Sequence, residues 1–236
     1  MKKTAILVDG AFYRKRATYL WDMKTPSERA NELYAYCMAH IRDDKPDADH
    51  HEERDLYRIF YYDCDPLKKT VYHPILKRGV DFGRNATYHW TISFFEELKK
   101  KRKLALRRGT LSDAFAHFSL KPDVVRALCE KRITVDELKE ADFDISFSQK
   151  GVDMRIGLDI SSLAYKKQVD QIILIAGDSD FVPAAKLARR EGIDFILDPM
   201  WATIKPDLFE HIDGLQSHWR PAYKKQLTGQ IQPSTE

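Results

Sequence analysis

Residues 172–180 have the sequence IILIAGDSD, an apolar run of strand length that stops on two carboxylates. A continuous run of Ile and Leu is typical of a strand buried on both faces of a parallel sheet. Residues 4–8, TAILV, form a second such run, and it ends on Asp9. Because carboxylates are costly to bury, strands that stop on them indicate a polar site at one edge of the sheet.

Helical and strand patterns alternate along the rest of the chain. Thr25-Pro26-Ser27-Glu28 is a capping box with Pro at the first helical position, so a helix of roughly 16 residues is expected there. Further strands are expected at 56–62, 145–148, 171–176 and 193–197, and further helices at 90–106, 153–167 and 181–191. Such alternation with short connections favours an α/β fold: an open, mostly parallel sheet flanked by helices on both faces.

The 236 residues are expected to form a single domain over residues 1–219. Two helix-start patterns, at Pro122 and at Thr134, predict a helical insertion at about 109–142. Residues 43–54 are dense in charge and predict an exposed loop, whose His50-His51 pair is taken as solvated rather than metal-binding. Residues 220–236 have little to pack and predict a flexible tail.

Composition excludes several classes of protein. Cys37, Cys64 and Cys129 are widely separated, which indicates neither a disulfide framework nor a zinc site and favours a reducing compartment. The first apolar run is too short for a signal peptide or a membrane span. A soluble, cytoplasmic protein with no membrane partner is therefore expected. The net charge of +3 neither demands nor excludes a polyanionic partner.

The aspartates that follow the strands are the candidate metal ligands. Asp9 and Asp178 meet if their strands are neighbours, because adjacent strands lie about 4.8 Å apart and ligands bind beyond the carboxyl ends of parallel strands. No helix is expected directly after Asp9, since Gly10 to Tyr13 resemble a turn, so Asp9 has no capping role to explain it. Asp180, by contrast, is placed to cap the helix that begins at Phe181.

A third acidic patch follows Gly151 and contains Asp153 and Asp159. Six helical positions correspond to about 600° of rotation, so both carboxylates cannot point the same way from one regular helix. Either Asp153 precedes the helix or only one of the two contacts the metal directly. Crowded carboxylates repel one another, and a hard cation removes that conflict. Oxygen-only ligation favours Mg²⁺ or Mn²⁺.

At this point the sequence resembles the NYN domain family, in particular the LabA-like branch of the PIN-like ribonuclease fold. The matching pieces are Val8-Asp9-Gly10-Ala11, Gln149-Lys150-Gly151-Val152-Asp153, Leu158-Asp159, Ala164-Tyr165, and Ala176-Gly177-Asp178-Ser179-Asp180-Phe181 with Pro183. The resemblance implies a metal-dependent endoribonuclease whose catalytic positions fall on Asp9, Asp153, Asp159, Asp178 and Asp180. All but Asp159 would bind the metal directly, and Asp159 would be a further ligand or would orient one.

Single-stranded RNA is the implied partner, and DNA is not excluded. Seven of the ten residues 99–108 are basic and would neutralise phosphates, so Lys99, Arg102 and Arg107 are candidate substrate contacts. Lys150 and Ser179, which lie beside the aspartates in sequence, complete this set. Tyr88 and Trp90 could stack on unpaired bases.

Other functions stay open at this stage. Many family members have Asn where this chain has Phe12, so a catalytically weak or inactive RNA-binding or adaptor module is the main alternative. A haloacid-dehalogenase-like phosphatase would need a nucleophilic Asp two residues before Asp9, where this chain has Leu7. A homodimer is possible.

Overall fold

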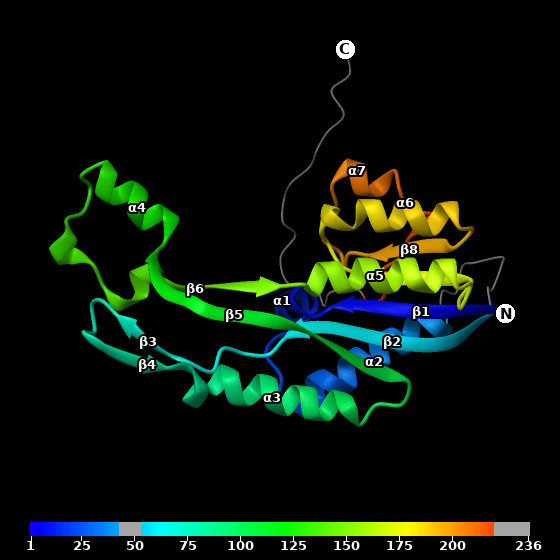
Figure 1. The fold of residues 1–236 in the computed structure, drawn as a ribbon, viewed down its shortest axis with the longest axis horizontal. Coiled ribbons are helices and arrows are strands. Elements are labelled where there is room, and N and C mark those ends of the chain that lie inside the picture. Colours follow the sequence, from blue (N-terminus) through cyan, green and yellow to red (C-terminus); the bar gives the residue numbers. More distant parts are fainter. Residues whose placement is uncertain (43–52, 220–236) are drawn as a thin grey trace, which may run out of the picture.

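The computed structural model describes residues 1–42 and 53–219, with the side chains of 112–115 and 148–150 outside the description. Seven strands form one sheet in the order β6-β5-β2-β1-β7-β8-β9 (Figure 1). All neighbours in it pair in parallel except β5 and β6, which are antiparallel. The strands are β1 (Lys2–Asp9), β2 (Arg54–Cys64), β5 (Leu104–Leu120), β6 (Phe143–Lys150), β7 (Gln171–Ile175), β8 (Asp194–Asp198) and β9 (Gly214–Leu215). The predicted α/β fold with a mostly parallel sheet is confirmed.

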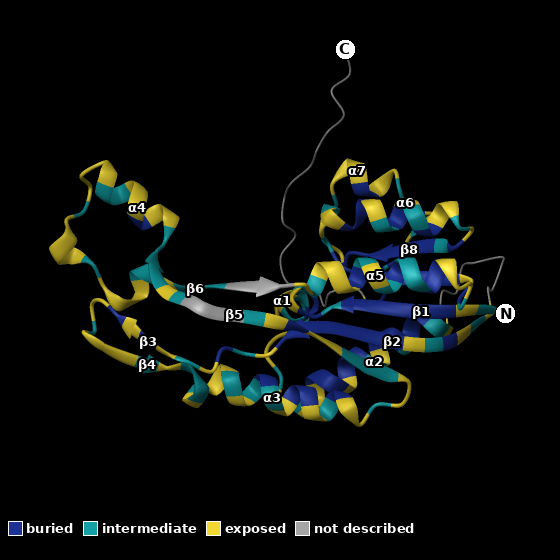
Figure 2. Ribbon diagram, in the orientation of Figure 1, coloured by how far each residue is buried: buried dark blue, intermediate teal, exposed yellow. Residues whose placement is uncertain are grey.

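Helices cover both faces of the sheet, and each face has its own apolar core. Ile6, Val8 and their neighbours on one face pack against three helices, α1 (Gly10–Trp21), α2 (Pro26–Arg42) and α3 (Ala86–Lys99). Ala5, Leu7 and their neighbours on the other face pack against α5 (Val152–Tyr165), α6 (Val182–Arg190) and α7 (Pro206–Phe209). The central strands are therefore buried on both sides (Figure 2), as their continuous apolar runs predict.

The predictions for the two helices near the N-terminus had opposite outcomes. The expected capping box is present at α2: Glu28 accepts from the Thr25 backbone N–H at 2.9 Å, and Thr25 accepts from that of Glu28. The turn expected at Gly10–Tyr13 is wrong, because α1 begins at Gly10, directly after β1. The sharp entry depends on Gly10, where an added Cβ would lie 2.6 Å from the Tyr61 ring and from the Tyr62 carbonyl oxygen.

The predicted helical insertion is only partly helical. Residues 110–150, here called the extension, begin as the outer half of β5 and return as β6, which pairs with it from Thr110↔Lys150 to Leu120↔Phe143. Between the strands lie α4 (Pro122–Cys129) and the single turns η2 (Val135–Glu137) and η3 (Glu140–Asp142). Residues 109–120 are strand rather than helix because ladder hydrogen bonds to β6 satisfy their backbone, and no local pattern revealed that partner.

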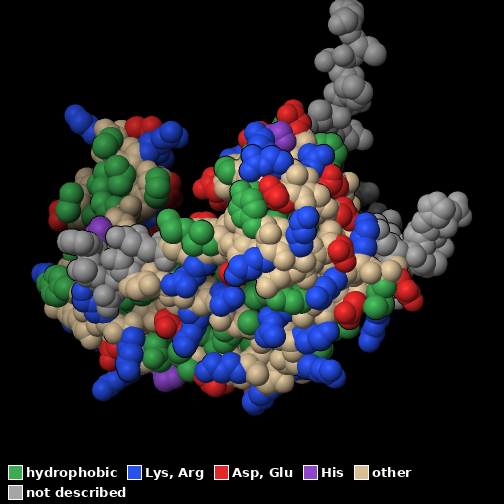
Figure 3. All heavy atoms as spheres, turned by 45° about the vertical axis from the view of Figure 1, so that its right-hand side comes forward, with side chains coloured by type: hydrophobic (Ala, Val, Ile, Leu, Met, Phe, Trp, Pro, Cys, Tyr) green, Lys and Arg blue, Asp and Glu red, His purple; other side chains and the backbone are tan. Residues whose placement is uncertain are grey.

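The hairpin of β3 (Thr70–His73) and β4 (Arg78–Asp81) packs beside the extension, where the His73 and Phe118 rings lie 4.3 Å apart. η1 (Phe82–Arg84) then leads into α3. Figure 3 shows a hollow between the extension and the part of the molecule that carries α5, α6 and α7. The expected loop at 43–52 and the expected tail at 220–236 lie outside the described residues. Within the described ranges, no helix has the length and apolar character needed to cross a membrane.

Candidate functional site

Strand order brings the first and last acidic patches together. β1 lies between β2 and β7, with Asp9 opposite Tyr62 and Val8 opposite Ile175. The crossover helices leave the sheet in opposite directions from this point, and that is where ligands bind in open parallel sheets. The expectation that the strands of Asp9 and Asp178 are neighbours is therefore correct.

Asp9 is both the last residue of β1 and the N-cap of α1. Its carboxylate accepts a hydrogen bond from the Phe12 backbone N–H at 3.1 Å, so the argument that Asp9 lacks a capping role is wrong. Burial raises the pKa of Asp9 to about 6 and outweighs the hydrogen bond from Phe12, which lowers it; the carboxylates of Asp153 and Asp63 raise it further. A capping role alone would lower this pKa, so the charged neighbours identify an acidic cluster.

Asp153 lies in the first turn of α5 and points toward this cluster. The preceding Gly151 has φ of +80°, a left-handed conformation that favours glycine, and it turns the chain from β6 into the helix. Partial burial raises the pKa of Asp153, and the carboxylates of Asp178 and Asp180 raise it further. Asp153 is therefore the group that links Asp9 electrostatically to the loop after β7.

The loop after β7 is organised by Asp178 rather than by Asp180. Asp178 accepts the Asp180 backbone N–H at 3.2 Å and caps the turn η4 (Ser179–Phe181). The prediction that Asp180 caps the following helix is wrong: the N-cap of α6 is Phe181. Both carboxylates are exposed, and Ser179 between them accepts a hydrogen bond from Lys205 Nζ at 3.0 Å. Lys205 was missed because it lies 26 residues further along the chain.

Asp159 does not join the cluster. It accepts a hydrogen bond from the Tyr62 hydroxyl at 2.8 Å and forms an ion pair with Arg107 at 3.0 Å. Six positions along α5 correspond to about 9 Å of rise, which carries Asp159 away from the carboxyl edge. Of the two geometric alternatives, the structure shows Asp153 inside the helix and Asp159 occupied by other partners. A role for Asp159 as a metal ligand is not supported by these contacts.

The basic run from 99 to 108 is divided between two edges of the sheet. Lys99 ends α3 and pairs with Glu96 at 2.5 Å, and the exposed Arg102 lies in the turn before β5 begins at Leu104. These two residues precede a parallel strand and therefore lie at the edge opposite Asp9 (Figure 1). Arg107 is opposite Tyr62, at the level of Asp9, but it is paired with Asp159.

The other predicted substrate contacts, Lys150, Trp90 and Tyr88, have different positions and roles. Lys150 ends β6 next to the turn into α5, and its side chain lies outside the described part of the structure. Trp90 has a structural role, because its indole N–H donates to the Lys24 carbonyl at 2.9 Å and its ring stacks on Phe94. Tyr88, in contrast, lines a pocket.

An ion pair beside the cluster was also missed. Asp63, near the end of β2, is buried and receives hydrogen bonds from Arg14 at 3.1 Å, from the Tyr61 hydroxyl and from the Cys64 backbone N–H. The apolar run ending on Asp63 obeys the same rule that identified Asp9, so the sequence did contain a signal for it. No comparable signal exists for Arg14, which reaches Asp63 from α1.

Position 12, where the resemblance leads one to expect Asn, holds a ring that covers backbone. A Cβ added to Gly177 would lie 2.5 Å from Phe12 Cε2, so the ring lies directly against the chain that leads to Asp178. Its backbone N–H still donates to the Asp9 carboxylate, which caps α1. Phe12 therefore closes the gap between the two strand ends with apolar surface and supplies no polar group there.

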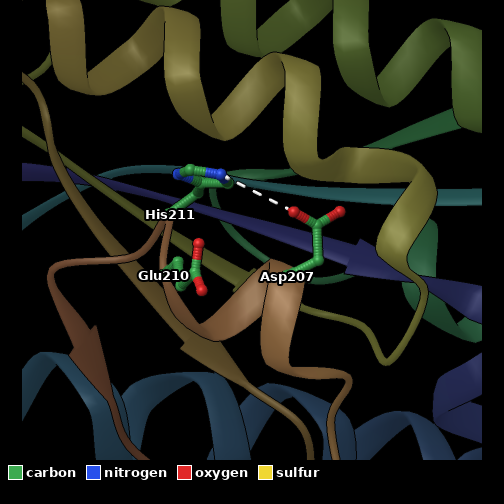
Figure 4. Close-up of side chains that lie close together, drawn as sticks. All are labelled: Asp207, Glu210 and His211. Carbon is green, nitrogen blue, oxygen red and sulfur yellow. Dashed lines mark ion pairs between the residues drawn. The ribbon is translucent and has the colours of Figure 1, made fainter.

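The carboxylates suit a hard divalent cation, although they are not closed around one. Among the described residues, the group of three potential ligands whose atoms lie within 4.8 Å of one another is Asp207, Glu210 and His211, at α7 (Figure 4). That group contains an ordinary ion pair of 3.7 Å between His211 and Asp207. Asp9, Asp153, Asp178 and Asp180 are more widely spaced, but all their donors are oxygens, and their mutual repulsion is relieved by a cation.

A model of the NYN domain matches residues 84–205, which is 122 of the 236 residues, and includes Asp153, Asp178, Asp180 and Lys205 but not Asp9. A crystal structure of a protein of unknown function from Vibrio parahaemolyticus RIMD 2210633 is similar over 91% of each chain, at 13% identity and a TM-score of 0.43. No curated protein matches the chain.

Proposed function

This chain belongs to the NYN domain family, which has a PIN-like, nuclease-type fold, and from that premise we propose that it is a metal-dependent endoribonuclease. The substrate class proposed is single-stranded RNA, and the reaction is hydrolysis of phosphodiester bonds. The observation that carries this proposal is the placement of Asp9, Asp153, Asp178 and Asp180 at the carboxyl edge. Burial raises the pKa of Asp9 and of Asp153 there, and neighbouring carboxylates raise both further.

These four aspartates would hold Mg²⁺ or Mn²⁺. The cation would supply Lewis-acid activation of the phosphodiester and of an attacking water, and it would stabilise charge on the leaving oxygen. Asp9 ends β1, Asp178 and Asp180 lie in the loop after the neighbouring strand β7, and Asp153 lies in the first turn of α5. Three separate elements therefore position the carboxylates.

Lys205 and Ser179 are the proposed phosphate contacts. Lys205 already donates to Ser179 beside Asp178, and an ammonium group there would neutralise a backbone phosphate. This pair replaces Lys99 and Arg102, which lie at the opposite edge. Water is the proposed nucleophile, since in-line hydrolysis of a phosphodiester needs no covalent protein intermediate.

The proposal is tested with labelled single-stranded RNA and DNA of one sequence, incubated with Mn²⁺ or with EDTA. Wild-type protein should cleave RNA only with the metal. Asp9→Asn and Asp178→Asn should each lower the rate about 1000-fold, equivalent to about 4 kcal/mol of transition-state stabilisation. Asp207→Asn is the matched control: it removes a carboxylate from the cluster at α7 and should leave the rate unchanged.

Two results would contradict the proposal. Cleavage that persists in both the Asp9→Asn and Asp178→Asn variants would remove the assignment of these carboxylates. RNA binding that survives EDTA, with no cleavage in Mn²⁺, would favour the binding or adaptor module instead. The Phe12 ring favours that second function, since it supplies no polar group beside the strand ends.

A further inference from the structure

A pocket of about 330 Å³ lies beyond the carboxyl end of β2. Its walls come from α1, from the segment after β2, from the start of α3 and from β6. The volume is in the range of sites that hold small organic groups. The family match assigns no role to this pocket, and the four aspartates of the acidic cluster do not line it.

The lining combines flat rings with neutral polar groups and two charged side chains, Arg14 and Asp65, of which Asp65 is paired with Arg108 at 2.8 Å. Phe82, Tyr88 and Phe147 contribute aromatic rings from three different elements. Asn85 and Thr91 contribute an amide and a hydroxyl, and Asn85 also caps α3 by accepting the Tyr88 backbone N–H at 2.7 Å. Rings that can stack, together with hydrogen-bonding groups at the edge, are the features by which proteins bind unpaired bases.

Arg14 connects this pocket to the acidic cluster. Arg14 lines the pocket, and its guanidinium pairs with Asp63 at 3.0 Å. Burial lowers the pKa of Arg14, but nearby groups, which include the Asp63 and Asp9 carboxylates, outweigh burial and raise it. Among the described residues, Arg14 Nε is buried and has no hydrogen-bond partner. Its terminal nitrogens donate to Thr91 at 3.4 Å and to Asp63 at 3.1 Å, and the guanidinium charge at this pocket is suited to a phosphate.

We propose that this pocket binds one unpaired base of the RNA, next to the phosphodiester bond that would be hydrolysed at the acidic cluster. The inference rests on the proposed function for its substrate class, but its binding step needs neither the metal nor cleavage. Tyr88 would stack on the base, and Asn85 would contact its polar edge. Arg14 would contact the phosphate between the bound nucleotide and the bond to be cleaved. Cleavage would then occur at a fixed distance from the bound base.

The test measures binding of a labelled single-stranded oligoribonucleotide in EDTA by fluorescence anisotropy. Tyr88→Leu removes the ring and should weaken binding about 5- to 150-fold, the range for loss of one stacked base. Tyr72→Leu is the matched control, because Tyr72 is 62% exposed on β3 and does not line the pocket. It should bind like the wild type.

A second measurement needs no change in the protein. The oligonucleotide is made with a single abasic nucleotide at each position in turn, and one position should weaken wild-type binding by the same factor as Tyr88→Leu. In Tyr88→Leu, that abasic nucleotide should cause no further loss. No detectable binding in EDTA, equal binding by Tyr88→Leu and the wild type, or no sensitive position would each overturn the inference.

Parallel assays in Mn²⁺ separate this inference from the proposed function. Cleavage without any base-sensitive position would remove the pocket and leave the nuclease. Base-sensitive binding without cleavage would keep the pocket and remove the nuclease.

Discussion

Two strand ends at the same edge of the sheet hold aspartates in opposite circumstances. Asp198 ends β8 and is fully buried. Its carboxylate accepts hydrogen bonds from the Tyr36 and Ser217 hydroxyls at 2.6 Å each and from the Met200 backbone N–H at 2.7 Å. His40 Nε2 lies 2.8 Å from the same carboxylate. Asp9 ends β1, two strands away, where its donors are the backbone N–H groups of Phe12 and Ala11 and other carboxylates lie nearby.

The pKa values record this difference. Burial would raise the pKa of Asp198, but the hydrogen bonds and charge of His40, with those of Ser217 and Tyr36, outweigh burial and lower it. Burial raises the pKa of Asp9 to about 6, and neighbouring carboxylates add to the effect. An aspartate surrounded by hydrogen-bond donors has a structural role, whereas one with few donors among like charges is a candidate ligand for a cation.

The largest effect on stability is expected at Asp198. Asp198→Asn leaves the surrounding donors without their charged acceptor and should lower the free energy of unfolding by about 3–5 kcal/mol at pH 7. Because the folded pKa of Asp198 is lowered, its contribution is present above the ordinary value of 3.8 and is lost as the pH falls through the folded value. Urea unfolding at several pH values measures both effects.

The control for that experiment is Asp207→Asn, at an exposed aspartate, which should change the free energy of unfolding little. An Asp198→Asn variant as stable as the wild type at pH 7 would show that the two strand ends do not differ as described.

Asp9→Asn should act in the opposite direction in metal-free protein. The raised folded pKa means that Asp9 destabilises the fold once it ionises, so the variant should be about 3 kcal/mol more stable than the wild type at pH 8. The two proteins should converge near pH 4, where the wild-type carboxyl is protonated in the folded state. Thermal unfolding in EDTA across this range measures the difference.

Mn²⁺ sharpens the same comparison. The cation should raise the unfolding midpoint of the wild type at pH 8 and should raise that of Asp9→Asn much less, since binding to the folded state stabilises it by mass action. A difference between variant and wild type that stays constant from pH 4 to pH 8, with equal Mn²⁺ responses, would contradict the assigned environment of Asp9.

The smallest effect concerns the cap of α1. Asn can accept the Phe12 backbone N–H as Asp9 does, but Ala cannot, so Asp9→Ala should be about 1 kcal/mol less stable than Asp9→Asn. Both variants lack the charge, so their difference isolates the cap. Chemical unfolding at pH 8 in EDTA compares them, and equal stability would mean that the cap contributes nothing measurable.

Local sequence patterns predicted much of the fold because they record local physics. Apolar runs identified the two central strands, and the capping box placed α2 correctly. Residues 109–120 were mispredicted because their hydrogen-bond partner is β6, which lies more than twenty residues further along the chain. The helix after Asp9 was missed because Gly10 suggested a turn. A glycine is required at this position because Tyr61 and Tyr62 leave no room for a Cβ.

The candidate site was predicted to a similar degree. Asp9 and Asp178 were singled out by apolar runs that stop on carboxylates, and the resemblance to the NYN family added roles for Asp153 and Asp180, which stay predictions. Asp63 is the penultimate residue of β2 and Asp198 ends β8, so the same rule would have found both without separating them by role. Lys205 and Arg14 come from distant segments, and no sequence pattern marks their approach to Ser179 and Asp63.

The chain's own pattern of apolar runs, caps and carboxylates established a parallel sheet with acidic strand ends and the resemblance to the NYN domain. Tertiary structure alone decided which carboxylates have donors, which have like charges as neighbours, and which basic residues lie at their edge. The reason is physical: periodicity and capping depend on residues a few positions apart. Burial, ion pairing and pKa depend instead on groups brought together from distant parts of the chain.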